Sequence, residues 1–169
     1  MTCPEDLGSP PNPSERRRIG LFDKARQSRE VFLMVERSAD WLRQASRDLE
    51  HARLDLKGGF YEWASFSAQQ AAEKAVQGLL QALGAESWGH SVADLLGGLP
   101  RKMKPAEDLL EAALRLDKAY IPTRYPNMHP SGSPSNRYTR REGEELIEDA
   151  EKILRYCQDH LPEARKRRS

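Results

Sequence analysis

The chain has 169 residues, of which 38% are hydrophobic and 31% charged, with a net charge of +1 and two cysteines. This length suits a single domain, and no apolar run approaches the roughly 20 residues of a membrane span. We therefore expect a protein without membrane contact, and the N-terminus lacks a secretory signal. Two widely separated cysteines argue against disulfides and favour the cytoplasm. Four scattered histidines without a Cys-x-x-Cys pair argue against a structural metal site, and no cofactor is predicted.

Composition divides the chain into three parts. Residues 1–35 begin with a proline-rich stretch, which is typical of disorder, and continue through a basic and then apolar stretch that is either a short helix or an extension. Met34 precedes the first strong helix pattern, so a true start at Met34 with a misannotated upstream extension is one interpretation. Residues 36–162 are expected to form one helical domain, and residues 163–169 a free basic tail.

The first two long helices are predicted from apolar side chains that recur every three or four residues. One is expected over residues 38–57, capped by Ser38 and ended by Gly58-Gly59. The other is expected over residues 60–83. Its small side chains should let a neighbouring helix approach closely: Ala64, Ala68, Ala71, Ala72 and Ala75. Its bulky residues should add to the packing surfaces: Phe60, Trp63, Val76, Leu79, Leu80 and Leu83.

A short helix and a further long helix follow. The short helix is expected over residues 92–96, with Ser91 as its cap. Pro105 suits the first turn of the long helix, which should reach Tyr120. The four prolines within residues 121–138 then predict a long loop.

The last helix is predicted to open at a capping box formed by Thr139 and Glu142 and to end before Pro162. Helices of this kind bury their apolar stripes against each other. The sequence therefore predicts an all-α fold, an up-and-down helical bundle of four long helices plus a short helix, with a long loop before the last helix.

Arg124 and His129 form an Arg-x4-His motif inside the long loop. Histidine can transfer a proton near neutral pH and arginine can hold a phosphate that gains charge, so a metal-free ribonuclease needs these two side chains most. From Lys118 to Arg141 the sequence has no acidic residue, so a polyanion could dock there. In the alternative interpretation Arg124 pairs with an acid such as Asp117, and His129 is a solvent-facing residue between prolines.

Further residues are candidates for binding RNA or a nucleotide. In and beside the loop they are Lys118, Tyr125, Asn127, Arg137, Arg140 and Arg141, and on the second helix they are Gln70 and Lys74. Tyrosine rings can stack on bases, but Tyr120 and Tyr125 could equally pin the loop by packing. Glu73 is expected on a solvated face, and Gln70 could be a buried hydrogen-bonding residue. His90 could bind a nucleotide, but capping and packing explain the His90-Ser91 pair and are preferred.

Several stretches between Ser38 and Leu161 resemble the HEPN family, the higher eukaryotes and prokaryotes nucleotide-binding domain. The stretches that carry the resemblance are Trp41-Leu-Arg-Gln-Ala45, Gly59 to Ala75, His90-Ser91 and Tyr120-Ile-Pro-Thr-Arg-Tyr-Pro126, the last similar to the family's RYPD-like branch. The resemblance implies a helical bundle that usually forms a homodimer. It also implies RNA cutting by Arg124 and His129, and small members often pair as toxins with a minimal nucleotidyltransferase antitoxin.

Two functions of different classes follow from these observations. The first is a metal-independent endoribonuclease, the toxin of a toxin–antitoxin pair, with a site built where two motif loops meet across a dimer. The second is a non-catalytic module that binds a nucleotide or a partner protein, or that serves dimerisation alone. Nucleotide protection against thermal unfolding without RNA cleavage would favour the second.

Overall fold

Five α-helices and three short 3-10 helices form the regular structure of residues 37–85 and 88–168, the residues that the computed structural model describes. The α-helices are α2 (Ser38–Gly58), α3 (Tyr61–Ala82), α4 (Val92–Gly97), α5 (Glu107–Ala119) and α6 (Arg140–Arg168). The 3-10 helices are η1 (Arg101–Met103), η2 (Pro126–Met128) and η3 (Pro134–Asn136). This described part contains no strand, so the predicted all-α fold is confirmed. The expectations for residues 1–35 lie outside it.

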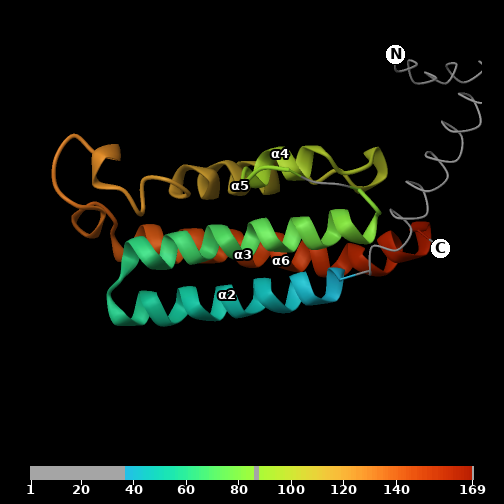
Figure 1. Ribbon diagram of the computed structural model, residues 1–169, viewed down its shortest axis with the longest axis horizontal. Coiled ribbons are helices and arrows are strands. Elements are labelled where there is room, and N and C mark those ends of the chain that lie inside the picture. Colours follow the sequence, from blue (N-terminus) through green and yellow to red (C-terminus); the bar gives the residue numbers. More distant parts are fainter. Residues whose placement is uncertain (1–36, 86–87, 169) are drawn as a thin grey trace, which may run out of the picture. The chain divides into compact units, whose positions relative to one another are not determined.

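Helix α3 lies at the centre of the bundle and contacts each of the other four α-helices. Helices α2 and α6 run along it, and α4 and α5 cover another side (Figure 1). The long loop of residues 120–139 joins α5 to α6 at the end of the bundle where α2 turns into α3 (Figure 1). The loop and the start of α3 therefore lie near each other.

Small residues explain how α3 can be packed on several sides. The predicted alanines Ala64, Ala68, Ala71, Ala72 and Ala75 are all 0% exposed. A Cβ atom at Gly78 would stand 2.9 Å from the Cβ of Trp41 on α2, which is closer than real contacts allow. The expected inward packing of Phe60 and Trp63 is wrong, because Ala64 and Ser65 take the buried positions at this end of α3 and leave the two rings 56% and 45% exposed.

Helix α2 ends in a Schellman motif at the predicted glycine pair. Gly59 adopts a φ of +84°, which favours glycine because it has no Cβ atom. Its N–H donates to Leu56 O at 3.2 Å, and the N–H of Phe60 donates to Asp55 O at 2.9 Å. The chain therefore turns sharply into α3.

Two helix ends differ from the prediction, the start of α2 and the end of α6, and these two ends contact each other. Ser38 does not cap α2, because Arg37 is the N-cap and Ser38 is a fully buried residue of the first turn. Helix α6 does not end before Pro162 but continues through it to Arg168. A proline inside a helix costs about 3 kcal/mol of stability. Arg165, which was expected in a free tail, donates Nη2 to Ser38 Oγ at 3.1 Å and so joins the last turns of α6 to α2.

The start of α6 is as predicted, and that of α5 is not. The N–H of Thr139 donates to Glu142 Oε2 at 2.8 Å and the N–H of Glu142 donates to Thr139 Oγ1 at 3.3 Å, which is a capping box. Helix α5 begins at Glu107 rather than Pro105, because Ala106 takes the extended conformation of an N-cap. The predicted apolar stripe of α6 is buried: Leu146, Ile147, Ala150, Ile153, Leu154 and Cys157.

Asp117 of α5 holds the N-terminus of α4. Ser91 caps α4 as predicted, because its Oγ accepts from the N–H of Asp94 at 3.1 Å. The same hydroxyl donates to Asp117 Oδ2 at 2.8 Å, and Asp117 also accepts from the N–H groups of Val92 at 2.7 Å and Ala93 at 3.1 Å. A carboxylate at a helix N-terminus is favoured by the free N–H groups and by the helix dipole.

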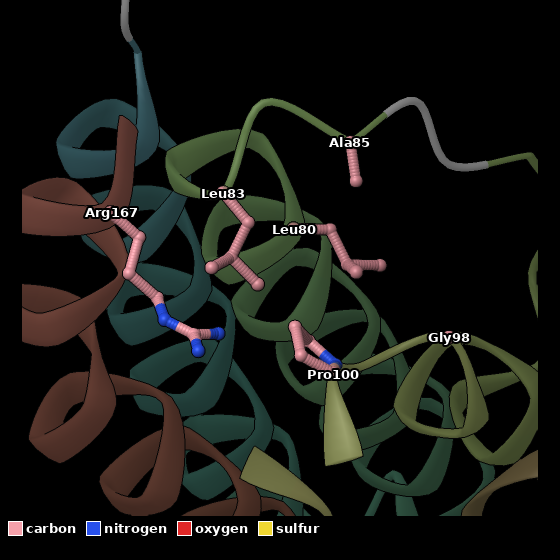
Figure 2. A pocket seen from close by; sticks show the side chains of 6 residues that line it. All are labelled: Leu80, Leu83, Ala85, Gly98, Pro100 and Arg167. Carbon is pink, nitrogen blue, oxygen red and sulfur yellow. The ribbon is translucent and has the colours of Figure 1, made fainter. Parts of the chain in front are cut away.

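None of the described helices combines the length and the apolar character that crossing a membrane requires. An open pocket of about 440 Å³ lies beside the end of α3, where Leu80 and Leu83 line it together with Pro100 and Arg167 (Figure 2). This end of α3 is opposite to the end that faces the long loop, so the pocket lies apart from the motif residues.

Candidate active site

Arg124 stands on a turn that continues α5. Thr123 is buried, and its Oγ1 donates to Ala119 O at 2.6 Å, which fixes the chain just beyond the helix. The N–H of Arg124 donates to Ile121 O at 3.1 Å, and its side-chain Nε donates to Tyr120 O at 3.0 Å. The arginine is therefore held through its backbone and through one side-chain nitrogen.

Three aromatic rings surround the Arg124 guanidinium. Its carbon lies 4.5 Å from the ring centroid of Phe66 on α3, 4.8 Å from that of Tyr120 and 5.2 Å from that of Tyr125. Cation–π contacts orient the guanidinium without neutralising it. Among the described residues no carboxylate pairs with Arg124, and its two Nη groups have no hydrogen-bond partner. The alternative pairing with Asp117 is wrong, because that carboxylate binds α4.

His129 is half-buried and fixed by a single hydrogen bond. Its Nε2 lies 2.8 Å from Pro122 O, and since a carbonyl oxygen only accepts, Nε2 carries a proton. Within the described residues Nδ1 has no partner, so its lone pair is available in the neutral ring. The edge of the ring meets Tyr138 at a centroid distance of 6.4 Å. Burial, and then the negative charge of Glu142, raise the pKa of Tyr138, so this phenol stays neutral beside the histidine.

Each of the two motif side chains donates a hydrogen bond to a backbone carbonyl group, and these two carbonyl groups belong to residues close together in the sequence. Arg124 donates to Tyr120 O and His129 to Pro122 O, so neither depends on the other for its position. Arg124 can present two Nη donors to an anion, and His129 can accept a proton at Nδ1. Such a loop can bind a phosphate and accept a proton. In residues 37–85 and 88–168 no three His, Cys, Asp or Glu side chains are grouped to hold a metal ion.

Three other candidates are exposed on and near this loop. Lys118 and Asn127 are exposed, and neither side chain has an ion-pair or hydrogen-bond partner in the described part of the chain. Tyr125 is 48% exposed and covers one side of the Arg124 guanidinium.

The remaining arginines of the acid-free stretch have partners. Arg137 donates Nε to Ser131 O at 3.0 Å and so pins the loop. The other two pair with glutamates one turn further along α6: Arg140 with Glu144 at 3.3 Å and Arg141 with Glu145 at 2.8 Å. These exposed pairs contribute little to stability, but each glutamate reduces the attraction of its arginine for a polyanion.

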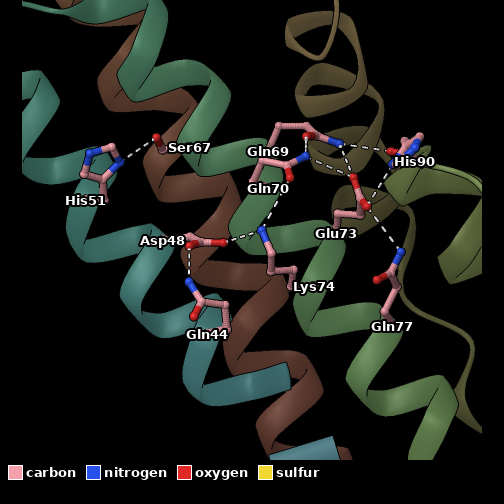
Figure 3. A network of polar contacts seen from close by, with 10 residues as sticks. All are labelled: Gln44, Asp48, His51, Ser67, Gln69, Gln70, Glu73, Lys74, Gln77 and His90. Atoms are coloured by element: carbon pink, nitrogen blue, oxygen red, sulfur yellow. Dashed lines mark hydrogen bonds and ion pairs between the residues drawn. The ribbon is translucent and has the colours of Figure 1, made fainter. Parts of the chain in front are cut away.

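Gln70 and Lys74 belong to a polar network on α3 (Figure 3). Gln70 donates Nε2 to Gln69 Oε1 at 2.7 Å and to Glu73 Oε2 at 3.1 Å. Lys74 donates Nζ to Asp48 Oδ2 on α2 at 2.6 Å. Both side chains are engaged inside the bundle, and no described contact joins either of them to the motif loop.

Glu73 is the centre of this network, and the expectation that it is solvated is wrong. The residue is 5% exposed, because His90 and the neighbouring glutamines of α3 lie against its carboxylate (Figure 3). Its Oε1 lies 3.0 Å from His90 Nδ1. Three amide groups also donate to the carboxylate: Gln69 at 3.2 Å, Gln70 at 3.1 Å and Gln77 at 3.2 Å.

Two further residues contact the site: Phe66 was not singled out from the sequence, and for His90 capping and packing were preferred over nucleotide binding. Phe66 stacks on Tyr120 at a centroid distance of 6.4 Å, and His90 stacks on the same ring at 4.9 Å. The spacing of Trp63 and Phe66 on α3 puts both rings on one face, which was a usable signal. The place of His90 depends on how its loop folds, so no local pattern indicates it.

Comparison with known proteins supports the fold described above. Residues 38–160 match the model of the HEPN domain. The crystal structure of TT1696 from Thermus thermophilus is 51% identical, covers 74% of this chain and 98% of its own, and has a TM-score of 0.73. An HEPN domain protein from Thermotoga maritima is 50% identical, covers 73% of this chain and 98% of its own, and has a TM-score of 0.60.

A further relative is MJ1304 of Methanocaldococcus jannaschii, whose name describes it as a candidate toxin. It is 29% identical over 132 residues, which are 73% of this chain and 87% of MJ1304. The predicted resemblance to the family is confirmed, while the RYPD-like branch stays a prediction. Since the match extends from the start of α2 to near the end of α6, the chain belongs to the HEPN domain family.

Proposed function

We propose that this protein is a metal-independent endoribonuclease that acts as a toxin, with Arg124 binding phosphate and His129 transferring a proton. The observation that carries the proposal is the Arg124 guanidinium, which lies against three rings with both Nη groups unoccupied among the described residues. A planar guanidinium held in this way offers paired donors to a phosphate that gains charge. The toxin role is supported by the name of the relative MJ1304.

The proposed reaction uses the ribose 2′-hydroxyl as the nucleophile. His129 Nδ1 accepts its proton, the 2′ oxygen attacks the neighbouring phosphorus, and a new P–O2′ bond forms. The P–O5′ bond breaks at the same time, and the leaving 5′ oxygen takes up a proton. Arg124 stabilises the charge on the non-bridging oxygens. The products are a 2′,3′-cyclic phosphate and a 5′-hydroxyl end, so DNA, which lacks the 2′-hydroxyl, should not be cut.

The bound RNA is expected to lie over the exposed residues of the loop. Lys118 and Asn127 can contact phosphate and sugar, and Tyr125 can stack on a base. The paired side chains are expected to contribute less: Arg137, Arg140, Arg141, Gln70 and Lys74.

RNA cleavage in the presence of EDTA tests the proposal. The purified protein should cut RNA and leave the cyclic phosphate, which mass spectrometry of the fragments identifies. Arg124→Ala and His129→Ala should each lower the rate by at least about 10²-fold while the melting temperature stays near that of the wild type. Wild-type protein that leaves diverse RNAs intact would exclude the nuclease.

A non-catalytic module that binds a nucleotide is the second candidate. The observation that favours it is the cluster of Tyr120, Tyr125 and Arg124, on which a base and its phosphate could lie together. A nucleotide that raises the melting temperature, together with no cleavage of any RNA, would select this function.

We also propose that the protein forms a homodimer beside the motif loop. Large apolar side chains are exposed at this end: Trp63 at 45%, Ile121 at 37%, Tyr125 at 48% and Met128 at 50%. A second copy across a two-fold axis would cover them and bring a second motif loop near the first. Sedimentation at micromolar concentration should detect the dimer, and a monomer alone would contradict it. A nucleotidyltransferase antitoxin is the further expected partner, and co-expression should then relieve toxicity.

A further inference from the structure

His90 and Glu73 form a hydrogen-bonded dyad that the proposed reaction has not yet used. Glu73 is almost fully buried on α3, whereas the side chain of His90 is 59% exposed. His90 is held twice by α3, because its Nδ1 lies 3.0 Å from Glu73 Oε1 and its backbone carbonyl accepts from Gln69 Nε2 at 2.9 Å. A buried carboxylate therefore orients an imidazole that reaches solvent (Figure 3).

The hydrogen bonds define which nitrogen of His90 is free. Glu73 accepts from three amide groups in addition to the imidazole, so it acts as an ionised acceptor on both oxygens. His90 Nδ1 is then the donor, and Nε2 is left to exchange a proton with a bound molecule. The negative charge of Glu73 also lies against the ring and offsets the positive charge of the imidazolium, as the buried carboxylate does in a Ser-His-Asp triad.

His90 of this dyad and Arg124 contact the same aromatic ring, that of Tyr120. The His90 ring stacks on Tyr120 with 4.9 Å between centroids, and the guanidinium carbon of Arg124 lies 4.8 Å from the centroid of the same Tyr120 ring. The separation of the His90 ring and the Arg124 guanidinium is therefore at most the sum of these two distances, and a phosphodiester bound between them could contact both. The histidine comes from the loop before α4 and the arginine from the turn after α5, so the α4–α5 packing brings them together.

We infer that His90 is the general acid of the proposed ribonuclease, positioned by Glu73. The inference rests on the proposed function. His129 takes the proton of the 2′-hydroxyl, the P–O2′ bond forms, the P–O5′ bond breaks, and His90 Nε2 gives its proton to the leaving 5′ oxygen. Exchange with water then removes the proton from His129 and returns one to His90. One chain thus supplies an acid, a base and an arginine, and the dimer need not supply the second histidine.

A matched control exists on the other side of α3. The His51 side chain is 64% exposed and its Nδ1 lies 3.4 Å from the Asp55 carboxylate, so it resembles His90 in exposure and in its acidic partner. Its other polar neighbour is Ser67 at 3.1 Å, and no described contact joins it to Arg124 or Tyr120. His51→Ala therefore removes an equivalent imidazole away from the site.

The test compares two RNA substrates under single-turnover conditions, one with the ordinary 5′ oxygen and one with sulfur in its place at the cleaved bond. A thiolate leaves without being protonated, so it does not need an acid. His90→Ala should cut the ordinary RNA about 10²-fold more slowly than wild type but cut the sulfur-containing RNA at nearly the wild-type rate. His90→Gln, which can still donate to Glu73, should behave alike, and His51→Ala should match wild type on both.

Three results would overturn the inference. Ordinary RNA cut by His90→Ala at the wild-type rate would remove His90 from the reaction. An equal loss on both substrates would show that His90 acts on binding or folding instead of protonation. Wild-type protein that cuts neither substrate would overturn the proposed function, and the inference with it. The activity of the wild type therefore distinguishes a failure of the proposed function from a failure of the inference about His90 alone.

Discussion

Arg115 and Arg124 lie on and just beyond the same helix, α5, yet their surroundings differ completely. Arg115 donates Nε to Asp149 Oδ2 at 2.7 Å and Nη2 to Asp149 Oδ1 at 2.9 Å. This is a bidentate ion pair, and Asp149 on α6 is only 3% exposed. The hydrogen bond to Asp149 raises the pKa of Arg115. Arg124 instead lies among aromatic rings, without a carboxylate among the described residues.

The difference shows how one residue type serves two purposes. Asp149 neutralises the charge of Arg115 in an ion pair that joins α5 to α6, because a buried carboxylate must be paired. The charge of Arg124 is oriented by ring faces but not neutralised, so its Nη donors stay available to an anion. The predictions below ask whether removing each arginine affects stability in one case and activity in the other.

The largest expected effect is that of Arg124→Lys on cleavage. A lysine keeps the charge but lacks the planar fork and stacks poorly on the three rings, so the rate should fall about 10²-fold. Single-turnover cleavage measures it. Arg115→Lys is the control and should cut RNA at the wild-type rate. A rapid Arg124→Lys enzyme would mean that charge alone matters at this position.

The next effect is the stability loss in Arg115→Ala. Without Arg115, the buried Asp149 keeps among the described residues only Lys152, 3.4 Å away, as an ion-pair partner. Because Arg115 is itself 45% exposed, we expect solvent to reduce the cost from the value for a fully buried pair to about 1–2 kcal/mol. Arg124→Ala should lose only its ring contacts, about 0.5–1 kcal/mol. Urea unfolding of both variants checks this order, and the reverse order would contradict the comparison.

The smallest effect concerns the salt dependence of RNA binding. Lys118 is exposed and unpaired among the described residues, so Lys118→Gln should lower the slope of log K against log salt by about 1. Arg141 faces Glu145, so Arg141→Gln should change the slope less. Fluorescence anisotropy at several salt concentrations measures both slopes. Equal changes would mean that the ion pair opens when RNA binds.

Local patterns were sufficient to predict most of the fold. The alanines of α3, the Gly58-Gly59 stop and the capping box of Thr139 and Glu142 depend on residues a few positions apart, and these predictions are confirmed. The end of α6 could not be predicted in this way. Helix α6 continues through Pro162 although a proline breaks the local rule, and Arg165 beyond it reaches Ser38 at the far end of the described sequence.

The candidate site was predicted only in part, for the same reason. Arg124 and His129 stand out by their spacing, whereas the glutamates that pair with Arg140 and Arg141 were not considered. The ring of Phe66 under Arg124 and the contact of His90 with Glu73 join segments that are distant in sequence. The spacing of Trp63 and Phe66 indicates an aromatic face on α3, but which residues lie over that face depends on how α3, α4 and α5 pack.

The most direct test of the account is cleavage of one RNA in EDTA by the wild type, Arg124→Ala and Arg115→Ala, each kept well below its melting temperature. The account predicts that Arg124→Ala loses about 10²–10³-fold in single-turnover rate while the less stable Arg115→Ala cuts as fast as the wild type. Equal rates for Arg124→Ala and wild type, or an equal loss in both variants, would contradict the claim that Arg124 is the phosphate-binding centre of the site.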